Sequence, residues 1–245
     1  MAPRASWLDR RIHVLGGSLP APAAILIGAI LVTSILGAQV PGLLDAGAFV
    51  PGLVLSGEVW RLVTWAFFEM HPLTLVFAAL ALFWFGNDLV RLWGPGRFLA
   101  TYLGLAAAAA GVTCLLALFW SRLSALQFLG AWPVISGLII AWAIAFPTRS
   151  IFVYFVLPLQ GRNLIYATLG GTLLVALLSG SIVSYVPNFV AELLALVAMR
   201  GRNPLSGLWT KVKFELAYRR WRHRSSNLRE VPRPRSRGED PRWYH

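Results

Sequence analysis

The sequence predicts an all-α membrane protein with six membrane-spanning helices. Hydrophobic residues make up 57% of the chain and charged residues only 13%, and the mean hydropathy is +0.65. This composition leaves too few polar residues to cover a water-soluble globule of 245 residues. The apolar runs are mostly close to the ~20 residues that a helix needs to cross a bilayer. The predicted helices cover residues 22–38, 68–86, 98–120, 130–147, 163–179 and 182–199.

The Lys and Arg residues set the orientation of these helices, because short cytoplasmic loops retain basic residues. With a cytoplasmic N-terminus, the outward segments contain only Arg61 and Arg122 of the 22 basic residues. The opposite orientation would reverse this ratio. Both termini are therefore predicted to face the cytoplasm, and we expect an integral multi-pass protein of a bacterial cytoplasmic membrane.

Three regions follow one another along the chain. Residues 1–21 form a short basic cytoplasmic lead, residues 22–199 form the membrane domain, and residues 200–245 form a basic cytoplasmic tail. The start of the tail has apolar residues at helical spacing, which predicts an interfacial helix, and the Arg-, Pro- and Ser-rich remainder predicts disorder. The expected partners are the lipid bilayer and, at the tail, anionic lipid headgroups. Nucleic acid is not expected, because the positive charge lies where the predicted topology places it.

Two connections have features of their own. Residues 39–67 form the longest outward segment and are rich in Pro, Gly and Trp. Trp60 and Trp65 suit the membrane interface, where an indole has one wet and one apolar side. Residues 87–97 are predicted to form a short basic loop on the cytoplasmic side.

A Gly-x-x-Trp-Arg-Leu-x-Thr run leads into the second and third predicted helices. On this run and the positions that follow it, the chain resembles the rhomboid family of intramembrane serine proteases. The resemblance spans roughly residues 20–200 and implies a rhomboid-like six-helix bundle, with Trp60 and Arg61 anchoring the large first outward loop. The matching residues are Gly57, Trp60, Arg61, Leu62, Thr64, Phe67, Leu82, Phe85, Gly86, Gly94, Arg97, Phe98 and Tyr102.

The resemblance also implies where a catalytic serine would lie. Rhomboids place this serine in a Gly-x-Ser-Gly motif at the outer end of the fourth helix, and Ser136 with Gly137 matches it. Val134 replaces the first glycine, and its branched side chain would crowd a loop that has to direct backbone N–H groups at an oxyanion. Ser136 is therefore a degenerate candidate nucleophile.

The partners of that serine are missing at the positions implied by the resemblance. Asn188 stands at the histidine position, and an amide has no basic nitrogen near neutral pH. Thr74 and Ala78 stand at the oxyanion-stabilising positions, where Thr74 retains one donor and Ala78 none. The only histidine predicted on the outer side is His71, which we interpret as an interfacial residue.

Glu192 is an acid inside the sixth apolar run, and intramembrane acids are costly enough to suggest a role. It lies one turn from Asn188, so the two side chains share a helix face that we expect to be directed toward Ser136. A hydrogen bond from Glu192 to a neighbouring helix and an unusual general base are the two alternatives.

We therefore expect a proteolytically inactive rhomboid-like protein that binds transmembrane segments of partner proteins. One alternative is an active intramembrane serine endopeptidase that uses Ser136, and another is a structural subunit of a membrane complex. The spacing of His, Cys, Asp and Glu suggests no metal site, and the sequence contains no phosphate-binding loop or dinucleotide fingerprint, so no cofactor is expected.

Overall fold

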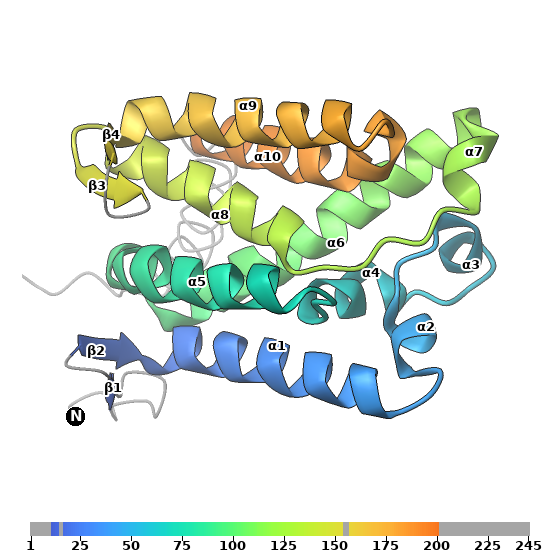
Figure 1. Cartoon of the computed structure of the whole chain (residues 1–245), viewed down its shortest axis with the longest axis horizontal. Helices are drawn as coiled ribbons and strands as arrows, with labels where there is room; N and C mark the ends of the chain where they lie inside the picture. The colour runs from blue at the N-terminus through green and yellow to red at the C-terminus, as the bar shows by residue number, and fades with distance from the viewer. Residues whose placement is uncertain (1–10, 15–16, 154–156, 201–245) are drawn as a thin grey trace, which may run out of the picture. The chain divides into compact units, whose positions relative to one another are not determined.

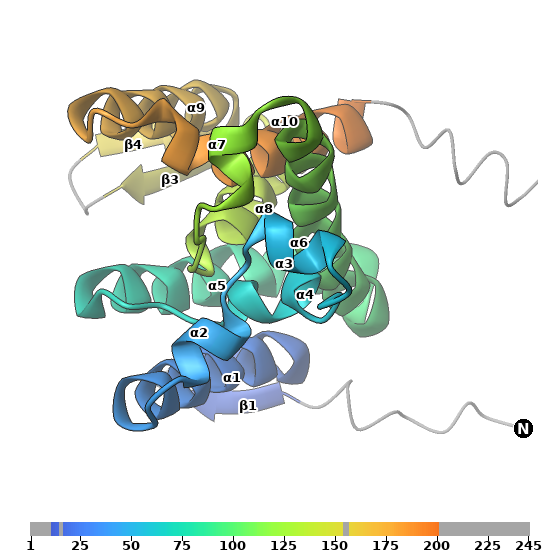
Figure 2. The same ribbon diagram turned by 90° about the vertical axis from the view of Figure 1, so that its right-hand side faces the viewer.

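The computed structural model describes residues 11–14, 17–153 and 157–200. The interfacial helix predicted for the tail lies outside these residues. Over the described residues the chain is a helical multi-pass membrane protein, as the sequence predicts. Figure 1 shows its main helices lying side by side, and Figure 2 shows them end-on from the side that carries α2, α3, α4 and α7.

Five described helical segments are long and apolar enough to cross a membrane. Three of these segments have a proline in their first turn. Proline lacks a backbone N–H group, and the first N–H groups of a helix have no partner within the helix, so nothing is lost there. The segments are α1 (Ala21–Gln39), α5 (Pro72–Trp93), α6 (Pro95–Phe119), α9 (Gly161–Leu178), and the short η3 (Ile182–Tyr185) continued by α10 (Val186–Arg200).

The sixth predicted helix is α8 (Trp132–Ala145), which has only 14 residues. It is about 21 Å long at 1.5 Å per residue, shorter than the hydrocarbon core. It does not need to match the bilayer, because α5, α6, α9 and α10 pack around it. Nearly all of its side chains from Pro133 to Ala143 are buried, so α8 is the centre of the core.

Close packing around this core requires a small residue at Gly137, one of two predicted glycine positions. A Cβ atom on Gly137 of α8 would lie 2.5 Å from Leu105 Cδ2 and 3.2 Å from the Ala191 carbonyl oxygen on α10. A Cβ atom on Gly86 of α5 would touch Ala23 on α1. Gly137 therefore sets the separation of the α8–α10 pair, whereas the nearest contact at Gly86, 3.4 Å, is ordinary van der Waals contact.

The predicted loop over residues 87–97 is wrong. Helix α5 continues to Trp93 and α6 starts at Pro95, so Gly94 alone joins them. Gly94 has φ +82°, a conformation that favours glycine. The charged residue Asp88 does not end α5, because its carboxylate is paired with side chains of other elements.

The outward connection between α1 and α5 is structured by short helices, and Arg61 holds it together. Arg61 is only 6% exposed. It pairs with Glu58 at 2.6 Å and donates hydrogen bonds to the carbonyl oxygens of Asp45 and Ala48. The short elements are α2 (Leu43–Gly47), α3 (Pro51–Leu55), α4 (Arg61–Thr64) and η2 (Trp65–Phe67), and α7 (Ser121–Ser124) follows α6 at the same end.

The two tryptophans of this connection, Trp60 and Trp65, differ in their exposure to the surroundings. Trp60 is half exposed and donates from Nε1 to the Ala46 carbonyl at 3.3 Å. Trp65 is fully buried, so its predicted place at the membrane interface is wrong. Its ring packs 5.9 Å from that of Phe49, and its N–H is satisfied locally by the Leu62 carbonyl.

Two antiparallel hairpins that the sequence did not predict lie at the other end. The first pairs β1 (Arg11–Val14) with β2 (Gly17–Pro20), with Arg11 opposite Pro20. The second pairs β3 (Ser150–Val153) with β4 (Leu157–Gln160), with Ser150 opposite Gln160, and links α8 to α9. Figure 1 shows both hairpins at the end where α5 turns into α6. This is the end that the basic residues predict to be cytoplasmic.

Candidate functional site

Ser136 lies inside α8 rather than in a loop. The helix starts at Trp132, so Ser136 belongs to its second turn and is fully buried. Its hydroxyl group donates to the Pro133 carbonyl oxygen at 2.9 Å, the usual local bond of a helical serine. Val134 is also fully buried in the first turn. The structure thus places a regular helical turn where the resemblance implies an open loop.

Glu192 on α10 joins this serine to α9. Its carboxylate Oε1 accepts a hydrogen bond of 2.6 Å from the Thr172 hydroxyl, and the side chain is fully buried. Ser136 lies close enough to interact with the same carboxyl group. This is the hydrogen bond to a neighbouring helix that the sequence left open as one alternative. Thr172 is the member of the cluster that the sequence analysis missed.

The second oxygen of Glu192 has no hydrogen-bond partner among the described residues, although it is buried. The Ser136 hydroxyl group donates to the Pro133 carbonyl oxygen at 2.9 Å, and the Glu192 carboxyl group lies within its reach. A nucleophilic attack needs a base that accepts the serine proton and space for a substrate carbonyl about 3 Å away. Ser136 is fully buried, so the described residues leave no space for a substrate carbonyl beside it, and Glu192, the acid within its reach, accepts a hydrogen bond from Thr172.

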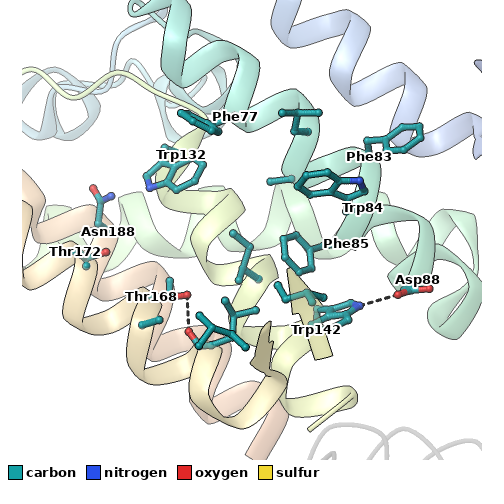
Figure 3. A pocket seen from close by; sticks show the side chains of 18 of the residues that line it. Phe77, Phe83, Trp84, Phe85, Asp88, Trp132, Trp142, Thr168, Thr172 and Asn188 are labelled. Carbon is teal, nitrogen blue, oxygen red and sulfur yellow. Dashed lines mark hydrogen bonds between the residues drawn. The ribbon is translucent and has the colours of Figure 1, made fainter. Parts of the chain in front are cut away.

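Asn188 lies one turn before Glu192 on α10 and is 9% exposed. It lines a groove of about 1040 Å³ that runs between α5 and α9 and has α8 as its floor. Thr172 lines the same groove from α9. Figure 3 shows Asn188 and Thr172 next to each other at one side of the groove, away from Trp142 and Asp88.

The groove is mainly apolar and aromatic. Phe77, Trp84 and Phe85 line it from α5, and Trp132 and Trp142 line it from α8. Its few polar side chains come from α5, α9, η3 and α10. They are Asn87, Asp88, Thr168, Thr172, Tyr185 and Asn188.

A polar cluster marks one end of this groove. Asp88 Oδ2 accepts hydrogen bonds from Trp142 Nε1 at 3.0 Å and from the Arg149 guanidinium at 2.5 Å. The guanidinium also lies 5.1 Å from the centre of the Phe146 ring. These contacts tie α5 to α8 and to the segment that follows α8, and they leave the Asp88 carboxylate with a counter-ion.

The structure does not bring the two predicted oxyanion positions to the groove. Thr74 and Ala78 both lie on α5, and neither belongs to the residues that line the groove. Ala78 is fully buried in the core. His71 is exposed at the N-cap position of α5. In the described part of the chain, the interactions of Ser136 involve no histidine.

Glu69 is a second acid that the sequence analysis missed, and it is half-buried. It precedes α5, and its Oε2 atom is buried and has no hydrogen-bond partner in the part of the chain that the structure describes. The backbone N–H groups of Ala131 and Trp132 point to this carboxylate at the start of α8. Burial nevertheless raises the pKa of Glu69 above its ordinary value of 4.5. The contacts with the Ala131 and Trp132 backbone join Glu69 to the start of the helix that contains Ser136.

The chain matches a known protein family over most of the membrane domain. A family model described as "Eukaryotic integral membrane protein (DUF1751)" matches residues 24–199, more than half of the chain. No curated protein matches the sequence. Because the matched family is eukaryotic, the predicted location in a bacterial cytoplasmic membrane is wrong. The prediction of an integral membrane protein is confirmed.

Proposed function

Because the chain belongs to DUF1751, a rhomboid-like family of eukaryotic integral membrane proteins, we propose that it binds transmembrane segments of other proteins without cleaving them. The observation that carries this proposal is the apolar groove between α5 and α9. Both walls are membrane-spanning helices, so the groove is reached from the bilayer. Its occupant is then a membrane-embedded segment.

The arrangement around Ser136 supports the absence of cleavage. The serine is fully buried and its hydroxyl donates within its own helix. The position of the missing histidine is held by Asn188, which cannot act as a base. Glu192 already accepts the Thr172 proton. Ser136, Thr172 and Glu192 act as a packing cluster that fixes α8, α9 and α10 behind the groove.

The groove also has the chemistry of a helix-binding site. In hydrocarbon, helices associate through close packing and through occasional hydrogen bonds between polar side chains. The large aromatic side chains of the groove give contact area, and its amide and hydroxyl groups give a few directional contacts. A lipid chain would satisfy the first requirement but not the second.

Site-specific photo-crosslinking tests the proposal. A photoreactive residue replaces Leu80, which lines the groove, and in a matched control it replaces Leu115, an exposed residue of α6 that does not. We expect protein adducts at Leu80 whose crosslinked peptide comes from a transmembrane segment, and lipid adducts at Leu115. Equal adducts at both positions, or only lipid at Leu80, would overturn the proposal.

A further inference from the structure

Asn188 on α10 is a polar side chain that the fold buries without pairing it. It is 9% exposed and lines the groove between α5 and α9. Glu192, one turn further along α10, bonds to Thr172, and among the described residues no group forms a hydrogen bond with the Asn188 amide. Asn188 therefore stays outside the packing cluster of Ser136, Thr172 and Glu192.

The groove gives access to this amide. In the described part of the chain, the side-chain atoms that are fully buried without a hydrogen-bond partner belong to Glu69, Asn87 and Glu192. The atoms of the Asn188 amide are not among them, so they keep an open surface, and Asn188 lines the groove (Figure 3). A molecule in the groove therefore contacts the amide directly.

Trp132 adds a second unpaired polar group to the same part of the groove. It is the first residue of α8, which packs against α10. Its indole lines the groove, and Figure 3 shows the ring nitrogen on the side of Asn188. Over the residues that the structure describes, no acceptor bonds to the Nε1–H group of Trp132. The groove thus offers one indole donor together with one amide that both donates and accepts.

Asn188 lies inside the hydrophobic span of its helix. The span is Ile182–Met199, so Asn188 is about 9 Å from the start of the span at 1.5 Å per residue. Lipid headgroups and water lie outside the hydrocarbon core, so they do not pair with an amide at this depth. A lipid chain that fills the groove offers neither a donor nor an acceptor. The unpaired amide stays costly until the occupant of the groove brings a polar group.

We propose that the groove selects transmembrane helices that carry a carboxamide or hydroxyl side chain at the depth of Asn188, where it pairs with Asn188 and Trp132. This inference rests on the proposed function, because it says which transmembrane segments bind. The partner side chain is neutral. No Lys, Arg or His belongs to the residues that line the groove, and Asp88, the acid among them, is already paired with Arg149. A carboxamide or hydroxyl both donates and accepts, so it satisfies the Asn188 amide in either orientation.

Reconstitution with a defined peptide tests this inference. The full-length protein, with a photoreactive residue at Leu80 in the groove, is placed in phosphatidylcholine vesicles with a leucine–alanine transmembrane peptide. One asparagine is moved through the peptide, one position at a time, and the peptide without asparagine gives the baseline. We expect the crosslinking yield to rise about three- to tenfold in one window, as for a single interhelical hydrogen bond in a membrane. The window should lie about six residues from one end of the peptide, which matches the depth of Asn188.

Variants of the protein make the result specific to this pair of side chains. Asn188→Leu should abolish the maximum, because it removes the amide and keeps a side chain of similar size. Trp132→Phe, which loses the indole N–H donor, should lower the maximum without moving it. Asn163→Leu, at an exposed position of α9 outside the groove, is the matched control and should leave the maximum unchanged. If Asn188→Leu does not fold, the shorter replacement Asn188→Ala decides the outcome.

The results that would overturn the inference differ in what they mean for the proposed function. Equal crosslinking for every asparagine position, or a maximum that survives in the Asn188 variant, would mean that the groove binds helices without this selection, and the proposed function would stand. No crosslinking of any peptide at Leu80 would contradict both.

Discussion

Thr172→Val removes the hydrogen bond that joins α9 to the buried acid of α10. The substitution keeps the shape of the side chain and deletes the hydroxyl that donates to Glu192 at 2.6 Å. Glu192 then has two buried oxygens without a donor, because Oε2 already lacks one. An unsatisfied buried acceptor costs about 1–3 kcal/mol, and measured bonds between membrane helices reach about 1.7 kcal/mol. We expect a loss of about 1–2 kcal/mol in the free energy of unfolding.

Thermal unfolding in detergent, followed by size-exclusion chromatography, measures this loss. For a chain of this size, about 1–2 kcal/mol corresponds to a fall of roughly 3–6 °C in Tm. Thr168→Val is the matched control on the same helix, because its hydroxyl bonds only within α9, and it should change Tm by about a third as much or less.

A double-mutant cycle sharpens the test. Replacing both partners by apolar groups of similar shape is often nearly neutral. The loss in the free energy of unfolding of the double variant Thr172→Val/Glu192→Met should therefore be about 1 kcal/mol smaller than the sum of the losses of the two single variants. Strict additivity, or equal losses for Thr172→Val and Thr168→Val, would refute the role assigned to this bond.

Three further substitutions test other parts of the structure. Arg61→Lys removes the planar guanidinium group that contacts Asp45, Ala48 and Glu58. It should lower the free energy of unfolding by about 2 kcal/mol and make residues 39–67 sensitive to limited proteolysis. Unchanged digestion would contradict this role of Arg61. Glu69→Gln should flatten the pH dependence of Tm. Burial raises the pKa of Glu69, so ionisation of Glu69 removes stability from the wild type as the pH rises above 4.5 and through the raised pKa, whereas glutamine cannot ionise. Parallel curves for the two proteins between pH 4 and 8 would show that Glu69 is not the cause. Gly137→Val should destabilise the α8–α10 contact by about 1–3 kcal/mol, whereas Gly111→Val, where a Cβ atom meets nothing within 4 Å, should have little effect; similar losses would argue against close packing at Gly137.

The fold could be predicted because the length of apolar sequence needed to cross hydrocarbon is easily recognised. Each predicted apolar run overlaps an observed helix, although the predicted end of the second run, residue 86, lies seven residues before Trp93. That error arose because Asp88 and Arg91 were interpreted as loop residues. In the folded protein Asp88 can remain within helix α5, because Arg149 and Trp142 donate hydrogen bonds to its carboxylate.

The site could be predicted only in part. Ser136, Asn188 and Glu192 were found because a polar residue in an apolar run is conspicuous and because the resemblance gave them positions. Thr172 was missed, since a threonine in a membrane helix usually bonds to its own backbone, and only the structure shows its bond to Glu192. Trp65 was assigned to the membrane interface because tryptophan is typical of that place. The sequence does not reveal that the ring of Phe49 packs against it in the folded protein.

The most direct test of Ser136 as a packing residue is labelling with an activity-based fluorophosphonate. The detergent-solubilised protein and its Ser136→Ala variant are compared, with an active rhomboid protease labelled alongside as the positive control. We predict no labelling of either form, because the Ser136 hydroxyl is buried and donates to the Pro133 carbonyl oxygen within its own helix. Labelling of the wild type that disappears in Ser136→Ala would contradict the account and indicate a serine protease.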